Sequence, residues 1–166
     1  MKRKVYHQPD SQSFSVVREG HPALMIAVAN PFGYFIKEAA AAETYIDLNR
    51  IIGLHGLRYK SVRALMSFLE LTTKGIAALT GVSTRTVSRW RDDSTIGVLP
   101  SKNLVKVDAL VQKGIEVFGS KELFKAWLNQ PNIALGDDTP LAMLSTPYGV
   151  ELVEDAIEAM AHGSVM

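Results

Sequence analysis

The chain has 166 residues, none of which is cysteine, and its longest apolar run extends only from Ala23 to Ala29. The missing thiols exclude a disulfide framework, a cysteine-ligated zinc site and a thiol nucleophile. A membrane-spanning helix needs about 20 apolar residues, so this run is too short to be one. The basic start, Met1 to Lys4, is followed by the polar residues Tyr6 to Ser13, which argues against a secretory signal. The sequence predicts a soluble cytoplasmic protein.

Groups suited to catalysis are also sparse. The four histidines are far apart in the sequence: His7, His21, His55 and His162. No phosphate-cradling glycine motif occurs, and no histidine pairs with another histidine or a carboxylate at a helical ligand spacing. The adjacent acids Asp92-Asp93 and Asp137-Asp138 fall in predicted loops, where such pairs are typical of caps and solvated turns. We therefore expect no enzymatic activity, no metal site and no cofactor.

Net charge is small as well, at +1, but the charges are unevenly distributed. Residues 50–91 carry eight basic side chains and one acidic side chain, for +7. Residues 92–166 carry five basic and eleven acidic side chains, for −6, and residues 1–49 are neutral with five of each sign. Because a partner meets the local charge, this asymmetry indicates a nucleic-acid surface in the middle of the chain and a different partner at its C-terminal end.

Apolar residues recur at helical spacing, and no segment shows sustained period-two alternation. The sequence therefore predicts an all-α fold. Caps and glycines suggest where the helices begin and end. The expected helices run from Ala39 to about Gly53, from a Ser61 cap to Leu71, from Thr73 to Gly81, from a Ser83 cap to Trp90, over 102–118, from a Ser120 cap to Gln130, over 141–145 and over 148–160.

Residues 73–90 have the spacing of a helix-turn-helix. This unit needs a small residue where its helices cross, a glycine at the turn, and apolar residues that fix the second helix. Ala77 is the small residue, Gly81 the turn and Val82 the apolar plug, while Val87 and Trp90 are expected to point inward. We predict that the second helix is a recognition helix for the major groove of DNA.

The outward positions around this turn are basic or hydroxylic, with no acid among them. A merely solvated face is the alternative interpretation, but such a face normally interleaves charges of both signs. The predicted DNA-binding residues are Lys74, Ser83, Thr84, Arg85, Thr86, Ser88, Arg89 and Arg91.

The C-terminal part contains a series of short motifs. They are Phe118-Gly119, Ala126-Trp127-Leu128, Pro131-Asn132-Ile133-Ala134-Leu135-Gly136, Thr139-Pro140-Leu141, Leu144-Ser145-Thr146, Gly149 and His162-Gly163. Together they resemble the toxin-binding domain of the Xre/MbcA/ParS antitoxin family, in which this domain follows an Xre-like helix-turn-helix. The resemblance covers residues 44–166. The chain departs from the family at 101–106, where an arginine-containing segment is usual, and residues 1–40 match nothing known.

Physical chemistry assigns structural roles to several of these motif residues. Trp127, with Phe124 and Leu128, is expected in the core. Thr139 is expected to cap the helix that Pro140 opens, and Gly136 to occupy a backbone conformation closed to other residues. Contacts with a partner are therefore expected on other, exposed positions.

The resemblance implies a type II antitoxin that neutralises a RES-domain toxin, a protein that consumes or transfers from NAD⁺, and that represses its own operon as a homodimer on operator DNA. It divides the chain into a partly flexible extension (1–40), a DNA-binding domain (41–100) and a toxin-binding domain (101–166). A dimeric regulator without a toxin is the alternative. The C-terminal tail either frays or enters the toxin's active site. The predicted toxin-binding residues are Tyr148, Glu151, Glu154, Asp155, Glu158, His162, Gly163, Ser164, Val165 and Met166.

Overall fold

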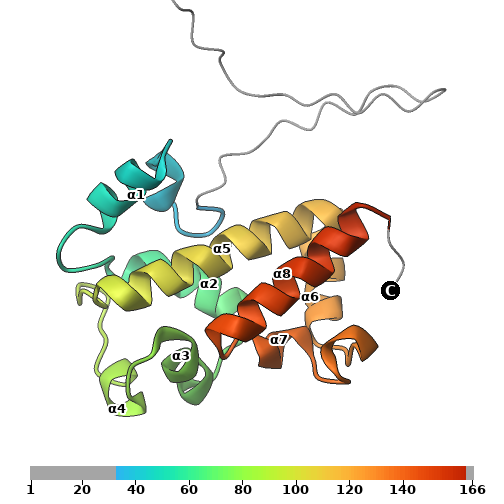
Figure 1. The fold of residues 1–166 in the computed structure, drawn as a ribbon. Helices are drawn as coiled ribbons and strands as arrows, with labels where there is room; N and C mark the ends of the chain where they lie inside the picture. The colour runs from blue at the N-terminus through green and yellow to red at the C-terminus, as the bar shows by residue number, and fades with distance from the viewer. Residues whose placement is uncertain (1–32, 164–166) are drawn as a thin grey trace, which may run out of the picture.

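The computed structural model describes residues 33–163, and over this range the chain is helical (Figure 1). Apart from two isolated bridges, this part of the chain contains no β-structure, which confirms the all-α prediction. In chain order the elements are η1 (Ala39–Ala41), α1 (Tyr45–Ile52), α2 (Tyr59–Phe68), α3 (Thr73–Thr80), α4 (Thr84–Val87), α5 (Val98–Phe118), α6 (Lys121–Leu128), η2 (Ile133–Leu135), α7 (Pro140–Met143) and α8 (Pro147–Ala161).

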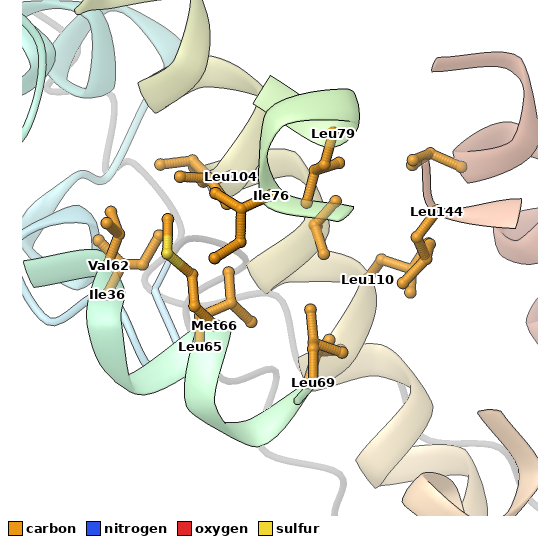
Figure 2. Close-up of a cluster of buried hydrophobic side chains, with 14 of the residues drawn as sticks. Ile36, Val62, Leu65, Met66, Leu69, Ile76, Leu79, Leu104, Leu110 and Leu144 are labelled. Atoms are coloured by element: carbon orange, nitrogen blue, oxygen red, sulfur yellow. The ribbon is translucent and has the colours of Figure 1, made fainter. Parts of the chain in front are cut away.

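Helix α5 is the axis of the molecule. It has 21 residues, the largest number of any described helix, and it packs against α1, α3, α6 and α8. Buried apolar side chains from α2, α3, α5 and the segment after α7 form one continuous cluster (Figure 2). Val62, Leu104 and Leu144 are each no more than 1% exposed. One core therefore joins the basic middle of the chain to its acidic C-terminal end.

A buried carboxylate on α5 holds the start of the described chain. Asp108 is fully buried, and its oxygens accept hydrogen bonds from the backbone N–H of Phe35 at 2.9 Å and of Ile36 at 3.0 Å. Burial raises the pKa of this carboxyl above its ordinary value, and the hydrogen bonds that it accepts offset only part of the rise. Ile36 and Ala39 are themselves fully buried, so the last residues of the expected N-terminal extension pack onto the core.

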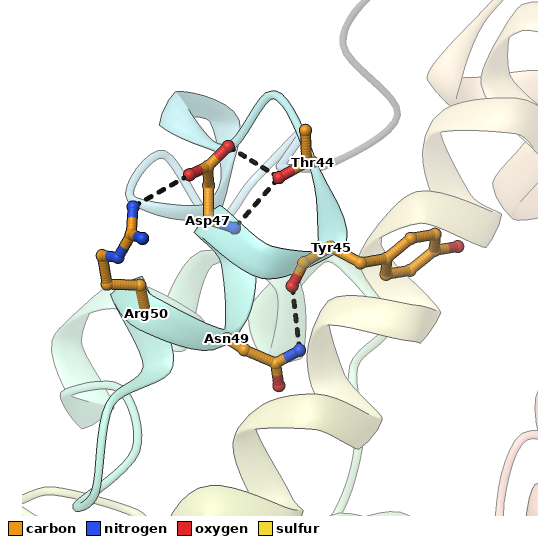
Figure 3. A network of polar contacts seen from close by, with 5 residues as sticks. All are labelled: Thr44, Tyr45, Asp47, Asn49 and Arg50. Carbon is orange, nitrogen blue, oxygen red and sulfur yellow. Dashed lines mark hydrogen bonds and ion pairs between the residues drawn. The ribbon is translucent and has the colours of Figure 1, made fainter.

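The expected helix over 39–52 is in fact two elements. Residues Ala39–Ala41 form a single 3₁₀ turn, after which the backbone becomes extended at Ala42 (φ −82°, ψ 125°). Thr44 then starts α1, because its hydroxyl accepts the N–H of Asp47 at 3.1 Å (Figure 3). A good N-cap inside a run of helix formers divides the run, since it satisfies the amide donors that the longer helix would have used.

Two other helix starts differ from prediction. Helix α2 begins at Tyr59, so Ser61 lies inside it and is not its cap. The extra turn exists because the N–H groups of Tyr59 and Lys60 bond to the carbonyls of Ser94 and Asp92 across the fold. Helix α5 begins at Val98, four residues before the expected start, directly after Gly97.

Packing around α6 confirms most of its expected core. Phe124 and Leu128 are buried, and Trp127 is partly buried, with its ring centroid 5.3 Å from Phe118. Leu123, the residue before Phe124 on this helix, is 59% exposed. Phe124 lies directly against Gly114 of α5, where any Cβ would collide with its ring.

Candidate functional site

The turn between α3 and α4 is built as the sequence predicts. Gly81 adopts a left-handed conformation (φ 73°), and its N–H donates to the carbonyl oxygen of Ala77 at 2.9 Å. Val82 donates to the same oxygen at 3.2 Å, which closes the end of α3. Ser83 then caps α4, because its hydroxyl accepts the N–H of Thr86 at 3.1 Å.

Helix α4 is shorter than the recognition helix that we expected. It ends at Val87, and the chain continues in tight i→i+3 hydrogen bonds from Arg89 to Thr86 and from Trp90 to Val87. The guanidinium of Arg91 donates to the carbonyl oxygen of Trp90 at 3.0 Å and holds this turn. Val87 and Trp90 are both 8% exposed, as predicted, so the outer positions still share one face.

All eight predicted DNA-binding residues are exposed, but they are not equivalent. Ser83 and Thr86 use their hydroxyls in the cap, and Ser88 donates to the carbonyl of Thr84 at 2.9 Å. Over residues 33–163, the side chains of Arg85 and Arg89 make no hydrogen bond and no ion pair. These two arginines are therefore the cations of this turn most available to a ligand.

Most of the basic block has no carboxylate partner in the described chain. Of its eight cations, Arg50 pairs with Asp47 and Arg63 pairs with Asp92. Glu70, the single acid of the block, pairs with Lys125 of α6 instead. The remaining six cations are Arg58, Lys60, Lys74, Arg85, Arg89 and Arg91. The positive charge of the sequence block thus persists at the surface of the folded chain.

Helix α8 presents the second candidate surface. Thr146 caps it through the N–H of Gly149, and Pro147 occupies its first turn. Val150, Val153 and Ile157 are buried. Of the predicted toxin-binding acids, Glu151, Asp155 and Glu158 are exposed and Glu154 is half-buried. Tyr148, near the start of α8, is 70% exposed.

Lysines of α5 neutralise half of the acids on α8. Lys106 pairs with Glu151 at 3.4 Å, and Lys113 hydrogen-bonds Glu158. The hydrogen bond from Lys113 lowers the pKa of Glu158. Over the described residues, Glu154 and Asp155 have no ion pair. His162 and Gly163 are exposed, while the predicted positions Ser164, Val165 and Met166 lie outside the described residues.

Sequence reasoning missed the role of these lysines, although a signal for it exists. Lys106 and Lys113 are seven residues apart on α5, and so are Glu151 and Glu158 on α8. Two parallel helices with equal spacing bring both pairs into register.

The segment in which the chain departs from the family pattern, 101–106, has structural partners. Ser101 is fully buried, and its hydroxyl accepts the N–H of Leu57 at 2.8 Å. Asn103 donates to the carbonyl oxygen of Leu79 at 3.1 Å, at the end of α3. This segment therefore attaches α5 to the turn that carries Arg85 and Arg89.

Residues 33–163 contain no group of three metal-ligating side chains that could hold an ion. None of the helices in this range combines the length and the apolar character needed to cross a membrane.

Comparisons with known proteins concern the C-terminal part most directly. A chain in the crystal structure of the M. tuberculosis MbcT–MbcA toxin–antitoxin complex has 23% identity and a TM-score of 0.45, and the match covers 63% of this chain and 94% of that chain. No protein of curated function matches. Residues 113–163 match the model of the antitoxin Xre/MbcA/ParS C-terminal toxin-binding domain. This match confirms the resemblance seen in the sequence: from the end of α5 through α8, the chain is similar to the toxin-binding domain of the Xre/MbcA/ParS antitoxin family.

Proposed function

We propose that this protein is the antitoxin of a type II toxin–antitoxin pair. In this proposal residues 101–166 bind and block a toxin, and residues 41–100 bind operator DNA. The observation that carries the proposal is the family match over residues 113–163. The chain acts by binding rather than by catalysis.

The toxin proposed is of the RES-domain type, which the family resemblance implies. A cleft built for a dinucleotide pyrophosphate is expected to be electropositive, and α8 presents acids to such a cleft. Glu154 and Asp155 are the strongest candidates, because they have no ion pair within the described residues. Glu151 and Glu158 must leave their lysines, or share them, before they contact a partner.

The experiment is co-purification with the product of the neighbouring gene, which this proposal expects to be a RES-domain toxin. The unchanged chain is expected to form a stable complex, and Glu154→Lys/Asp155→Lys to reduce its recovery strongly. Glu38→Lys/Glu43→Lys is the matched control, since both residues are exposed acids on the N-terminal elements. A complex that tolerates the α8 change as well as the control change would remove α8 from the interface.

The second half of the proposal is autorepression by a homodimer. One module offers few phosphate contacts, and a two-fold dimer would place two recognition elements about 34–36 Å apart on one face of the duplex. Arg85 and Arg89 would contact bases or phosphates, while Arg91 would mainly hold the turn in shape. Footprinting upstream of the gene is expected to reveal two protected half-sites separated by one helical turn.

A regulator without a toxin is the alternative, and the basic α3–α4 surface favours it equally. The co-purification experiment separates the two. If the neighbouring gene encodes no toxin, or its product does not bind, the C-terminal domain serves another ligand.

A further inference from the structure

A groove runs along α5 between α1 and α8, away from the α3–α4 turn. Its volume is about 760 Å³, within the range of ~300–1,000 Å³ that is usual for ligand pockets. Val105 and Ala109 of α5 lie in its floor, and Leu48 and Ile52 form the side that α1 contributes. Glu154 is the residue that α8 contributes. The groove therefore offers an apolar floor between two helices.

Charged side chains stand at the rim of the groove, and the floor between them is apolar. Lys106 and Lys113 stand on the α8 side and are engaged with glutamates of that helix. On the α1 side, Asn49 turns its amide back to the carbonyl of Tyr45 at 2.8 Å (Figure 3). An occupant of this groove must therefore be apolar along its length and carry no charge into the floor.

The described chain begins beside this groove. Asp108 holds the backbone of Phe35 and Ile36, and Gln112, one helical turn further along α5, lines the groove. Lys121, just beyond the end of α5, lies 5.2 Å from the ring centroid of Tyr34. Residues 34–36, near the start of the described chain, are thus held beside the 108–112 stretch of α5, at the edge of the groove.

The sequence just before residue 33 is apolar, as the groove floor is, and it is long enough to reach along that floor. Residues 23–29 are uniformly apolar, and residues 21–36 contain no charged side chain except for the titratable His21. The seven residue steps from Ala29 to Ile36 can span up to about 24 Å when extended. The groove floor from Lys102 to Glu116 is roughly 21 Å long at the rise of an α-helix. The apolar run can therefore reach the whole floor.

We propose that residues 23–29 of the same chain dock in the groove between α1, α5 and α8. A tethered segment has an effective local concentration in the millimolar range, which favours it over the same segment of a second copy at ordinary protein concentrations. When docked, the segment covers Glu154 and the α1-facing side of α8.

The absence of cysteine makes a thiol-accessibility experiment possible on the full chain. Ala109→Cys places one thiol in the floor, and its rate of reaction with a maleimide is measured. In a background with Leu24→Asp/Ile26→Asp the rate is expected to rise at least about tenfold, because the charged segment no longer covers the floor. The conservative background Leu24→Met/Ile26→Val is expected to keep the protection.

Two further probes make the outcome decisive. Asn49→Cys, on the exposed side of α1, repeats the measurement without disturbing the floor, and Leu123→Cys, exposed on α6 outside the groove, is expected to react equally fast in every background. Equal rates in all backgrounds at both groove positions would overturn the proposal. Protection that increases with protein concentration would overturn its intramolecular form and identify a second copy as the occupant. Neither readout involves toxin or DNA, so the result is independent of the proposed function.

Discussion

The α3–α4 surface and the α8 surface differ in how they hold their charge as well as in its sign. Around the α3–α4 turn, Arg85 and Arg89 project from one short helical turn without an ion pair in the described chain. On α8, two of four acids are engaged by lysines of α5 across a well-packed helix pair. Unpaired cations strengthen binding to polyanionic DNA, because they can contact its phosphates. Binding to a folded protein partner depends instead on a fixed arrangement of charges that complements the partner's surface.

The largest expected effect separates the two surfaces directly. Arg85→Ala/Arg89→Ala should weaken operator binding by about 2–6 kcal/mol, since each arginine that reads a base contributes about 1–3 kcal/mol. Toxin binding should remain unchanged. Fluorescence anisotropy with an operator duplex gives the affinity, and Lys37→Ala/Lys121→Ala removes the same charge outside the basic block as a control. If the Arg85→Ala/Arg89→Ala variant bound the operator as tightly as the control variant does, the α3–α4 turn would not be the DNA-binding surface.

A core substitution tests whether the two surfaces depend on one another. Phe124→Ala should lower the free energy of unfolding by about 3–5 kcal/mol, because the fully buried ring packs against Gly114 of α5. Since one core connects both surfaces, a single urea transition is expected, monitored by Trp90 and Trp127 fluorescence. Two separate transitions would instead establish that residues 41–100 and 101–166 fold independently.

The caps of α4 and α8 are expected to affect their two surfaces differently, with smaller energies than the core substitution. Ser83→Ala and Thr146→Ala each remove one capping hydroxyl, at a cost of about 0.5–2 kcal/mol. Helix α4 is a single turn, so Ser83→Ala should weaken operator binding severalfold. Helix α8 is held by Val150, Val153 and Ile157, so Thr146→Ala should lower the melting temperature but leave toxin affinity intact. The opposite pattern would mean that α8, and not α4, depends on its cap.

The smallest effect concerns the neutralised acids. Lys113→Met should raise the pKa of Glu158 toward its ordinary value, because the hydrogen bond that lowers it is removed. A lowered folded-state pKa stabilises the protein above the unfolded-state pKa, and this contribution is lost as pH falls through the folded-state value. NMR titration of Glu158 measures the shift, with Lys102→Met as the control. An unchanged Glu158 pKa would mean that the pair is not formed in solution.

Local signals in the sequence predicted the parts of the fold that depend on neighbouring residues. Gly81, Ser83, Ser120 and Thr139 all have the turn or cap roles expected of them. These roles need only a few adjacent residues, so a pattern of letters is enough to find them.

Long-range contacts explain where prediction failed. Helix α2 starts before Ser61 because backbone groups of 92–94 bond to its first turn. The carboxylate of Asp108 holds a segment more than 70 residues earlier in the chain. The sequence contains all of these groups, but which of them meet is decided only by packing around α5.

The central claim is that this chain neutralises a toxin through its C-terminal domain. The most direct measurement is growth and cellular NAD⁺ when a RES-domain toxin, proposed as the product of the neighbouring gene, is expressed with and without the full chain. The account predicts that growth and NAD⁺ are both restored by the full chain and by Arg85→Ala/Arg89→Ala, but not by Glu154→Lys/Asp155→Lys. Continued growth arrest and NAD⁺ loss in the presence of the folded, unchanged chain would contradict it.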